Sequence, residues 1–255
     1  MDLLYGPVAS WRLGKSLGVD LICSSKKICS FNCIYCQLQE TEKITAKRQK
    51  FVDLTKLKQE LETTLKESNP DVITLSGTGE PTLASNMDKA IKIIKKTTDL
   101  PIAILTNSTM FPNKKVRETL QKIDIIVAKL DAPNEQVFQK INQPAEKINF
   151  KKTFKGIKKI KKSFKGKLSL QMMFMDENKD YVDEMVKRAE EINPDEIQIN
   201  TPLRPCKLSP LSKKELDIIE KKFKDFNTLN VYHSTKPKVN PLEKIDILRR
   251  RGTEK

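Results

Sequence analysis

Short apolar runs and amphipathic segments alternate along most of this chain, and each pattern predicts a different kind of element. Compact apolar runs predict strands at residues 16–22, 72–75, 101–105, 123–130, 167–175 and 196–200. Apolar residues at helical spacing predict helices at residues 51–67, 87–96, 114–121, 150–163, 178–192 and 212–223. A last short β-rich piece is expected at residues 231–233.

The regular alternation of strands and helices determines the expected fold. Strands separated by helices pair in parallel, with the helices as crossovers. About six strands are too few to close an eight-stranded barrel, so we predict an α/β fold built as a partial (β/α)6 TIM-like barrel. In such folds the chemistry gathers in the loops at the carboxyl ends of the strands. We expect residues 1–230 to form this core domain and residues 231–255 to form a short C-terminal extension.

Composition bounds the setting of the protein. The chain has 255 residues, a mass of 29.2 kDa and a mean hydropathy of -0.51, which suit one substantial core. It has no apolar run of the length that spans a bilayer, and residues 1–6 lack the plan of a signal peptide. We therefore expect a cytoplasmic protein with no membrane partner, whose thiols stay reduced.

The net charge of +15 is a weak indication of a polyanionic partner such as RNA. Most of the 48 basic residues are lysine, whereas arginine is the better fork for phosphates and bases. The densest basic stretch, residues 151–167, alternates lysines with apolar residues at helical spacing, which is typical of a helix with a solvated face. The charge alone therefore leaves RNA as an open alternative.

Three of the five cysteines lie close together, at Cys29, Cys33 and Cys36. The segments between them are short enough for one loop to wrap a small metal cluster. A cluster of four irons presents four corners, of which three thiolates fill three and leave one open to another ligand. The spacing of the three cysteines resembles that of the cluster loop in radical S-adenosylmethionine (SAM) enzymes, which implies that the amino and carboxylate groups of SAM chelate the open iron.

Two other interpretations of the cysteine loop remain. A structural zinc site needs a fourth ligand, which would have to come from Cys23 or the distant Cys206, since the only histidine is His233. Buried cysteines without any ligand are the second interpretation. The density of the three thiols favours the iron cluster over both.

A second motif follows the predicted strand at residues 72–75 and runs from Ser76 to Pro81. Gly77 and Gly79 permit positive φ and a close approach of the backbone to a ligand. Polar side chains suited to a ribose, a carboxylate or a substrate also lie at or near the ends of later strands. These are Asn107, Asp131, Gln171 and Asn200.

The cysteine loop and the glycine motif together resemble those of the radical SAM superfamily. Residues 5–205 are similar to a subgroup of iron–sulfur oxidoreductase-like proteins related to wyosine-tRNA (4-demethylwyosine) synthases. The resemblance implies a [4Fe-4S] cluster on the three cysteines, SAM as the second cofactor, and a low-potential electron donor of the flavodoxin or ferredoxin type. The SAM-binding residues expected from this resemblance and from the strand ends are Tyr35, Gly77, Thr78, Gly79, Glu80, Pro81, Asn107, Asp131, Gln171 and Asn200.

The resulting hypothesis is a radical SAM enzyme that cleaves SAM reductively and abstracts hydrogen from an unidentified substrate. Wyosine-type synthases use additional cysteines for a second cluster, and Cys23 and Cys206 are too few to form one. A tRNA-modifying synthase remains an alternative, as do a non-catalytic iron–sulfur carrier or sensor and a zinc-dependent RNA-binding module. The basic tail around residues 249–251 resembles the entry to a small helical module of related chains, so we expect a truncated appendage there.

Overall fold

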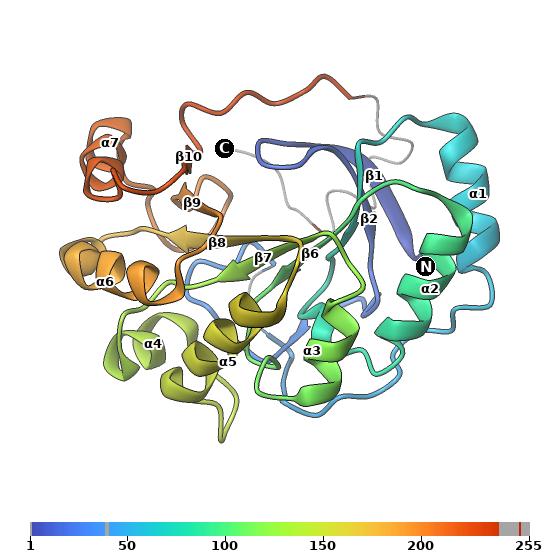
Figure 1. Cartoon of the computed structure of the whole chain (residues 1–255), viewed down its shortest axis with the longest axis horizontal. Coiled ribbons are helices and arrows are strands. Elements are labelled where there is room, and N and C mark those ends of the chain that lie inside the picture. The colour runs from blue at the N-terminus through green and yellow to red at the C-terminus, as the bar shows by residue number, and fades with distance from the viewer. Residues whose placement is uncertain (1, 39–40, 240–249, 251–255) are drawn as a thin grey trace.

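A curled sheet of eight strands organises the computed structural model, which describes residues 2–38, 41–239 and 250. The strand order is β1-β2-β5-β6-β7-β8-β9-β10, and the helices run around the outside of the curve (Figure 1). Every neighbouring pair is parallel except β1 with β2. The predicted partial TIM-like barrel is confirmed.

The strands of the main sheet are β1 (Leu4–Ser10), β2 (Gly14–Val19), β5 (Val72–Leu75), β6 (Ile102–Thr106), β7 (Ile125–Lys129), β8 (Lys167–Met173), β9 (Glu196–Asn200) and β10 (Thr228–Asn230). Two short strands, β3 (Ile28–Cys29) and β4 (Lys43–Ile44), pair with each other beside it. The central strands are buried on both faces and consist largely of Val, Ile and Leu, the composition expected of parallel strands covered on both sides.

The helices are α1 (Leu57–Glu67), α2 (Met87–Thr97), α3 (Lys114–Leu120), α4 (Glu135–Asn142), α5 (Phe150–Ser163), α6 (Val182–Ile192) and α7 (Lys213–Lys222), with short 3-10 turns at Pro81–Leu83 and Lys179–Tyr181. Each crossover helix packs an apolar stripe on the sheet. In α2, for example, Met87, Ala90, Ile91 and Ile94 are buried at helical spacing. Asparagine or serine side chains cap several helix starts, as Asn149 does for α5.

The main differences from the sequence prediction concern β1, α4 and β10. The N-terminal strand β1 was not predicted, because Gly6 and Pro7 interrupt its apolar run and Gly6 has a φ of 104°. Helix α4 was also missed, although Asn134 caps it. The last strand, β10, ends at Asn230. Residues 231–233, where a β-rich piece was expected, form the turn that follows it.

The boundary expected between residues 230 and 231 stays a prediction. Residues 231–239 continue directly from the last strand, and of the tail beyond them the structure describes Arg250 alone. The basic run expected to begin an appendage therefore lies mostly outside the described residues.

Candidate active site

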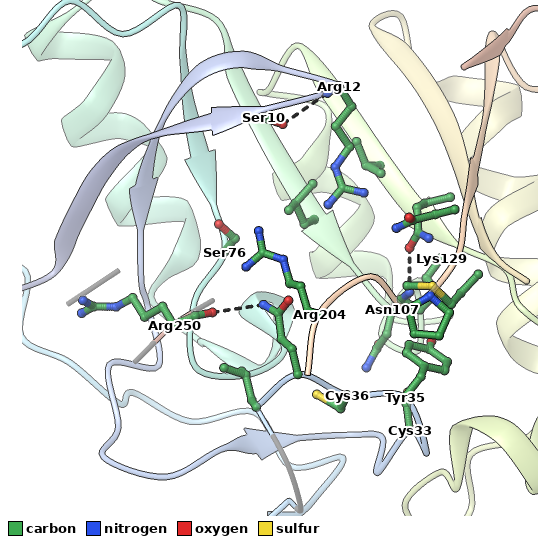
Figure 2. Close-up of a pocket in the computed structure, with 18 of the residues that line it drawn as sticks. Ser10, Arg12, Cys33, Tyr35, Cys36, Ser76, Asn107, Lys129, Arg204 and Arg250 are labelled. Atoms are coloured by element: carbon green, nitrogen blue, oxygen red, sulfur yellow. Dashed lines mark hydrogen bonds between the residues drawn. The ribbon is translucent and has the colours of Figure 1, made fainter. Parts of the chain in front are cut away.

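A cavity of about 520 Å³ opens at the carboxyl ends of the parallel strands. It brings together all three clustered cysteines and side chains from the strand ends, although these residues lie far apart in the sequence (Figure 2). Of the residues predicted from the sequence, the cavity is lined by Cys29, Cys33, Cys36, Tyr35, Gly77, Gly79, Glu80, Asn107, Gln171 and Asn200.

The cysteine loop is joined by backbone hydrogen bonds to the glycine motif that follows β5. The Ile28 amide donates to the Thr78 carbonyl at 3.1 Å, and the Glu80 amide donates to the Ile28 carbonyl at 3.2 Å. A Cβ atom at Gly79 would lie 1.7 Å from the Ile28 carbonyl oxygen. Only glycine permits this close approach, so Gly79 fixes the first cysteine against the glycine motif.

The other half of the cysteine loop is held by the unpredicted helix α4. The last carbonyls of a helix have no partner inside it. Here the Ile141 carbonyl accepts from the Ile34 amide at 3.0 Å, and the Asn32 amide donates to the carbonyls of Asn142 at 3.0 Å and Gln143 at 3.1 Å. The carboxyl end of α4 therefore sets the path of the loop between Cys29 and Cys36.

Burial keeps the cysteine thiols protonated unless nearby groups stabilise the negative charge of the thiolate. Burial raises the pKa of Cys29 to about 12, and it also raises the pKa of Cys33. Side-chain amides reach both sulfurs, from Asn107 to Cys29 at 3.6 Å and from Asn142 to Cys33 at 3.5 Å. Three thiols on one wall, with amide donors to two of them, fit the ligand set of an iron–sulfur cluster.

A lysine adjoins the same three sulfurs. Lys27 is 5% exposed, and its Nζ has no nitrogen or oxygen partner among the described residues. Burial acts to lower the pKa of Lys27, whereas negative charge on the sulfurs of Cys36, Cys29 and Cys33 acts to raise that pKa. Sequence reasoning missed Lys27. Its only signal was its position two residues before Cys29, and a chain rich in lysine gives that position little weight.

Glu80 connects two strand-end loops. It is 2% exposed, and its carboxylate accepts from the Thr106 hydroxyl at 2.7 Å, the Asn107 amide at 2.7 Å, and both the amide and hydroxyl of Thr82. Burial raises the pKa of this carboxyl, while the four donors act in the opposite direction. With both oxygens engaged, Glu80 positions the glycine motif and Asn107.

Three predicted residues lie outside the cavity lining. The Thr78 hydroxyl turns away and donates to buried Asp20 at 2.9 Å, and Pro81 begins a buried 3-10 turn. Asp131 lies behind Tyr35 and accepts from the Tyr35 hydroxyl, the Asn142 amide at 3.1 Å and the Met173 backbone at 2.9 Å. These contacts give Asp131 the task of orienting Tyr35.

Gln171 and Lys129 form a polar pair inside the cavity. The Lys129 Nζ donates to the Gln171 Oε1 at 2.6 Å and lies 4.9 Å from the centre of the Tyr35 ring. The Gln171 Nε2 is buried and has no partner among the described residues. An unsatisfied buried donor is costly, and an acceptor on a bound molecule would offset that cost. The Asn200 Oδ1 accepts a hydrogen bond from the Thr201 backbone amide at 2.9 Å.

A basic rim, which we define as Arg12, Arg204 and Lys236, completes the lining. Arg12 comes from the β1–β2 turn and Arg204 from the loop after β9, and both reach toward the middle of the cavity (Figure 2). The Arg12 Cζ, the central carbon of the guanidinium, lies 5.3 Å from the centre of the Trp11 ring. Neither Cys23 nor Cys206 lines the cavity.

A buried ion pair closes the cavity beneath the glycine motif. The Arg250 Nε donates to the Asp20 Oδ2 at 3.0 Å, with both side chains almost wholly buried. The same carboxylate accepts from the Thr78 amide at 3.0 Å and from the Cys23 amide at 2.8 Å. Asp20 thus ties the end of the first parallel strand to the glycine motif.

The half-barrel with three cysteines at its strand ends defines an iron–sulfur protein of the SAM-dependent type. The family model described as the radical SAM superfamily matches residues 24–189, and the chain belongs to that superfamily. Membership implies a [4Fe-4S] cluster and SAM as cofactors, and the cysteines and the cavity fit both. Within the described residues, no helix has the length and apolar character to cross a membrane.

Two curated proteins are similar to most of this chain. A UPF0026 protein of Synechocystis is 40% identical over 203 residues, which is 79% of this chain and 76% of that protein. A Brachyspira hyodysenteriae protein named GTPase Obg is 35% identical over 227 residues, 86% of this chain, so the chain spans only 33% of that relative.

Among solved structures, anSMEcpe with bound AdoMet has a TM-score of 0.64 at 18% identity, covering 85% of this chain and 64% of its own. Archaeal TYW1 has a TM-score of 0.56 at 15% identity, covering 83% and 72%. At these identities the two structures show a shared fold.

Proposed function

We propose that this protein is a radical SAM enzyme that acts on an anionic substrate. When bound and reduced, the cluster supplies the electron that cleaves SAM to methionine and a deoxyadenosyl radical, which takes hydrogen from the substrate. That electron comes from a low-potential donor of the flavodoxin or ferredoxin type. The observation that carries the proposal is the meeting of three thiols, a glycine-lined backbone and an unsatisfied amide in one cavity.

Residues of the chain divide the tasks of holding the two cofactors. Cys29, Cys33 and Cys36 would bind the cluster, because they are the cysteines that share the cavity wall. The backbone at Gly77 and Gly79 would receive the amino group of SAM. The Gln171 Nε2, with Lys129 beside it, supplies donors for a carboxylate or a ribose hydroxyl.

The charge of the lining supports an anionic substrate. Glu80 is the one acidic residue among the described residues that line the cavity, and its oxygens are occupied by protein donors. The basic rim adds three cationic side chains to the same lining. Arginine presents a planar fork of donors that matches carboxylates and phosphates, so the rim suits a substrate bearing one of these groups.

Anaerobic reconstitution tests the proposal directly. The purified protein is supplied with iron and sulfide, reduced with dithionite and incubated with SAM, and deoxyadenosine is then measured. We expect about four irons per chain, a spectral change on adding SAM, and deoxyadenosine. In Cys33→Ser we expect loss of the cluster and of the product, whereas Cys206→Ser, outside the cavity lining, should retain both.

Other outcomes would support other functions. A cluster that shows no spectral change with SAM would indicate an iron–sulfur carrier or sensor. A colourless protein with stoichiometric zinc would indicate a zinc site. Either result would contradict the proposed function.

A further inference from the structure

Lys27 has no evident role in the fold, although it is buried. A lysine that is 5% exposed normally carries its ammonium to water or to a carboxylate. The adjacent Lys26 does so, since its exposed ammonium lies 3.3 Å from Glu42. For Lys27 no oxygen or nitrogen partner exists among the described residues, and the side chain faces the cavity.

Neutral thiols cannot balance this buried charge. A buried ammonium without a counter-charge is strongly unfavourable. The Glu80 carboxylate is held by Thr82, Thr106 and Asn107, and the described residues show no ion pair between Glu80 and Lys27. Lys27 lines the same cavity as Cys29, Cys33 and Cys36, and its buried Nζ has no hydrogen-bond partner among the described residues. The ammonium therefore lacks a counter-charge until a negatively charged group occupies the cavity beside the cysteines.

A bound cluster supplies the missing negative charge. An iron–sulfur cluster held by three thiolates carries a net negative charge, and reduction by one electron makes it more negative. A fixed positive charge beside it stabilises the reduced state more than the oxidised state. Net charge and the surroundings of the sulfurs are known determinants of cluster reduction potentials.

We propose that Lys27 is a positioning residue of the cluster whose ammonium serves as the counter-charge of the three thiolates and raises the reduction potential. This role rests on the proposed function, because it requires the cluster at Cys29, Cys33 and Cys36. It explains why a lysine is buried at a site where neither solvent nor a carboxylate reaches it.

The test is a redox titration of the reconstituted cluster in Lys27→Met, followed by electron paramagnetic resonance. Methionine keeps the length and apolar stem of lysine and removes the charge. At the wild-type midpoint we expect the ratio of reduced to oxidised cluster to fall about tenfold, which corresponds to about 59 mV for a one-electron couple. Lys27→Arg should restore a potential close to that of the wild type.

Lys26→Met is the matched control, since it removes the same charge one residue away on an exposed side chain. It should leave the midpoint unchanged. An unchanged midpoint in Lys27→Met, or an equal shift in both variants, would overturn the inference while leaving the proposed function intact. A wild-type protein that holds no iron would instead defeat the proposed function.

A second measurement covers a Lys27→Met variant that cannot retain its cluster. In the metal-free protein the ammonium is uncompensated, so Lys27→Met should melt at a higher temperature than the wild type. Loss of the cluster together with a higher melting temperature supports the inference, because the Lys27 charge then stabilises the bound cluster and destabilises the metal-free fold. Loss of the cluster with an unchanged or lower melting temperature overturns it.

Discussion

The cysteine end of the cavity is fixed by backbone hydrogen bonds, whereas the basic rim consists of long side chains on three separate segments outside the helices and strands. Ile28 pairs with the glycine motif, and Ile34 pairs with the end of α4. By contrast, Arg12 and Arg204 extend from the β1–β2 turn and from the loop after β9, and both are partly exposed (Figure 2). The geometry of the cysteine end is therefore set by the path of the backbone, whereas the charge of the basic rim is set by which side chains the loops carry.

This difference separates two requirements of the proposed chemistry. A cluster and SAM need ligands at fixed distances, and backbone contacts with buried partners hold such distances well. A substrate is recognised by charge and shape, which a few substitutions on loops can alter without changing the fold. We therefore expect changes at the cysteine end to affect folding and cofactor binding together, and changes at the rim to affect ligand affinity alone.

The largest effect is expected for Gly79→Ala. The new methyl group would lie 1.7 Å from the Ile28 carbonyl oxygen, and backbone atoms cannot move aside as a flexible side chain can. Forced repacking costs about 1–3 kcal/mol, and this site belongs at the upper end. We expect the cysteine loop to separate from the glycine motif, with loss of iron binding as well as of stability.

Gly166→Ala is the control for that change. Its methyl group would also meet a backbone oxygen, that of Asp124 at 2.3 Å, but residue 166 does not line the cavity. Urea unfolding should show destabilisation in both variants, whereas iron content after reconstitution should fall only in Gly79→Ala. Equal iron content in the two variants would contradict the role assigned to Gly79.

An intermediate effect is expected for Glu80→Gln. The amide can keep one oxygen acceptor, but its NH2 group then faces a donor such as the Asn107 amide, which is left buried and unsatisfied. Such a loss costs about 2 kcal/mol. Chemical denaturation of the metal-free protein measures it. Glu42→Gln, which alters an exposed ion pair with Lys26, should change the unfolding free energy by less than about 0.5 kcal/mol.

The contrast between the two ends also explains what the sequence could predict. The cysteine spacing and the glycine motif are local patterns, so they located one wall of the cavity. Asn107, Gln171 and Asn200 followed from the rule that parallel strands end at one edge, and the structure places all three in the lining.

Tertiary partners account for what the sequence could not predict. Asp131 also ends a strand, yet Tyr35, Asn142 and Met173 occupy its carboxylate, and no local pattern reveals that. Lys27 and Lys129 differ from the other lysines only in burial, which depends on the packing of distant segments.

The smallest effect is expected at the basic rim, and the chain's single tryptophan provides the measurement. Trp11 lines the cavity beside Arg12, so its fluorescence should change saturably when tripolyphosphate, an anionic probe, binds there. Arg204→Gln removes one cation of the rim and should weaken binding about fivefold, or about 1 kcal/mol, because a partly exposed charge pair contributes little more. Arg117→Gln removes an equal charge outside the cavity lining, where the guanidinium caps the Phe111 carbonyl at 2.7 Å. If Arg117→Gln weakened binding equally, the anion would be sensing net charge, and the rim would have no specific part in recognising the substrate.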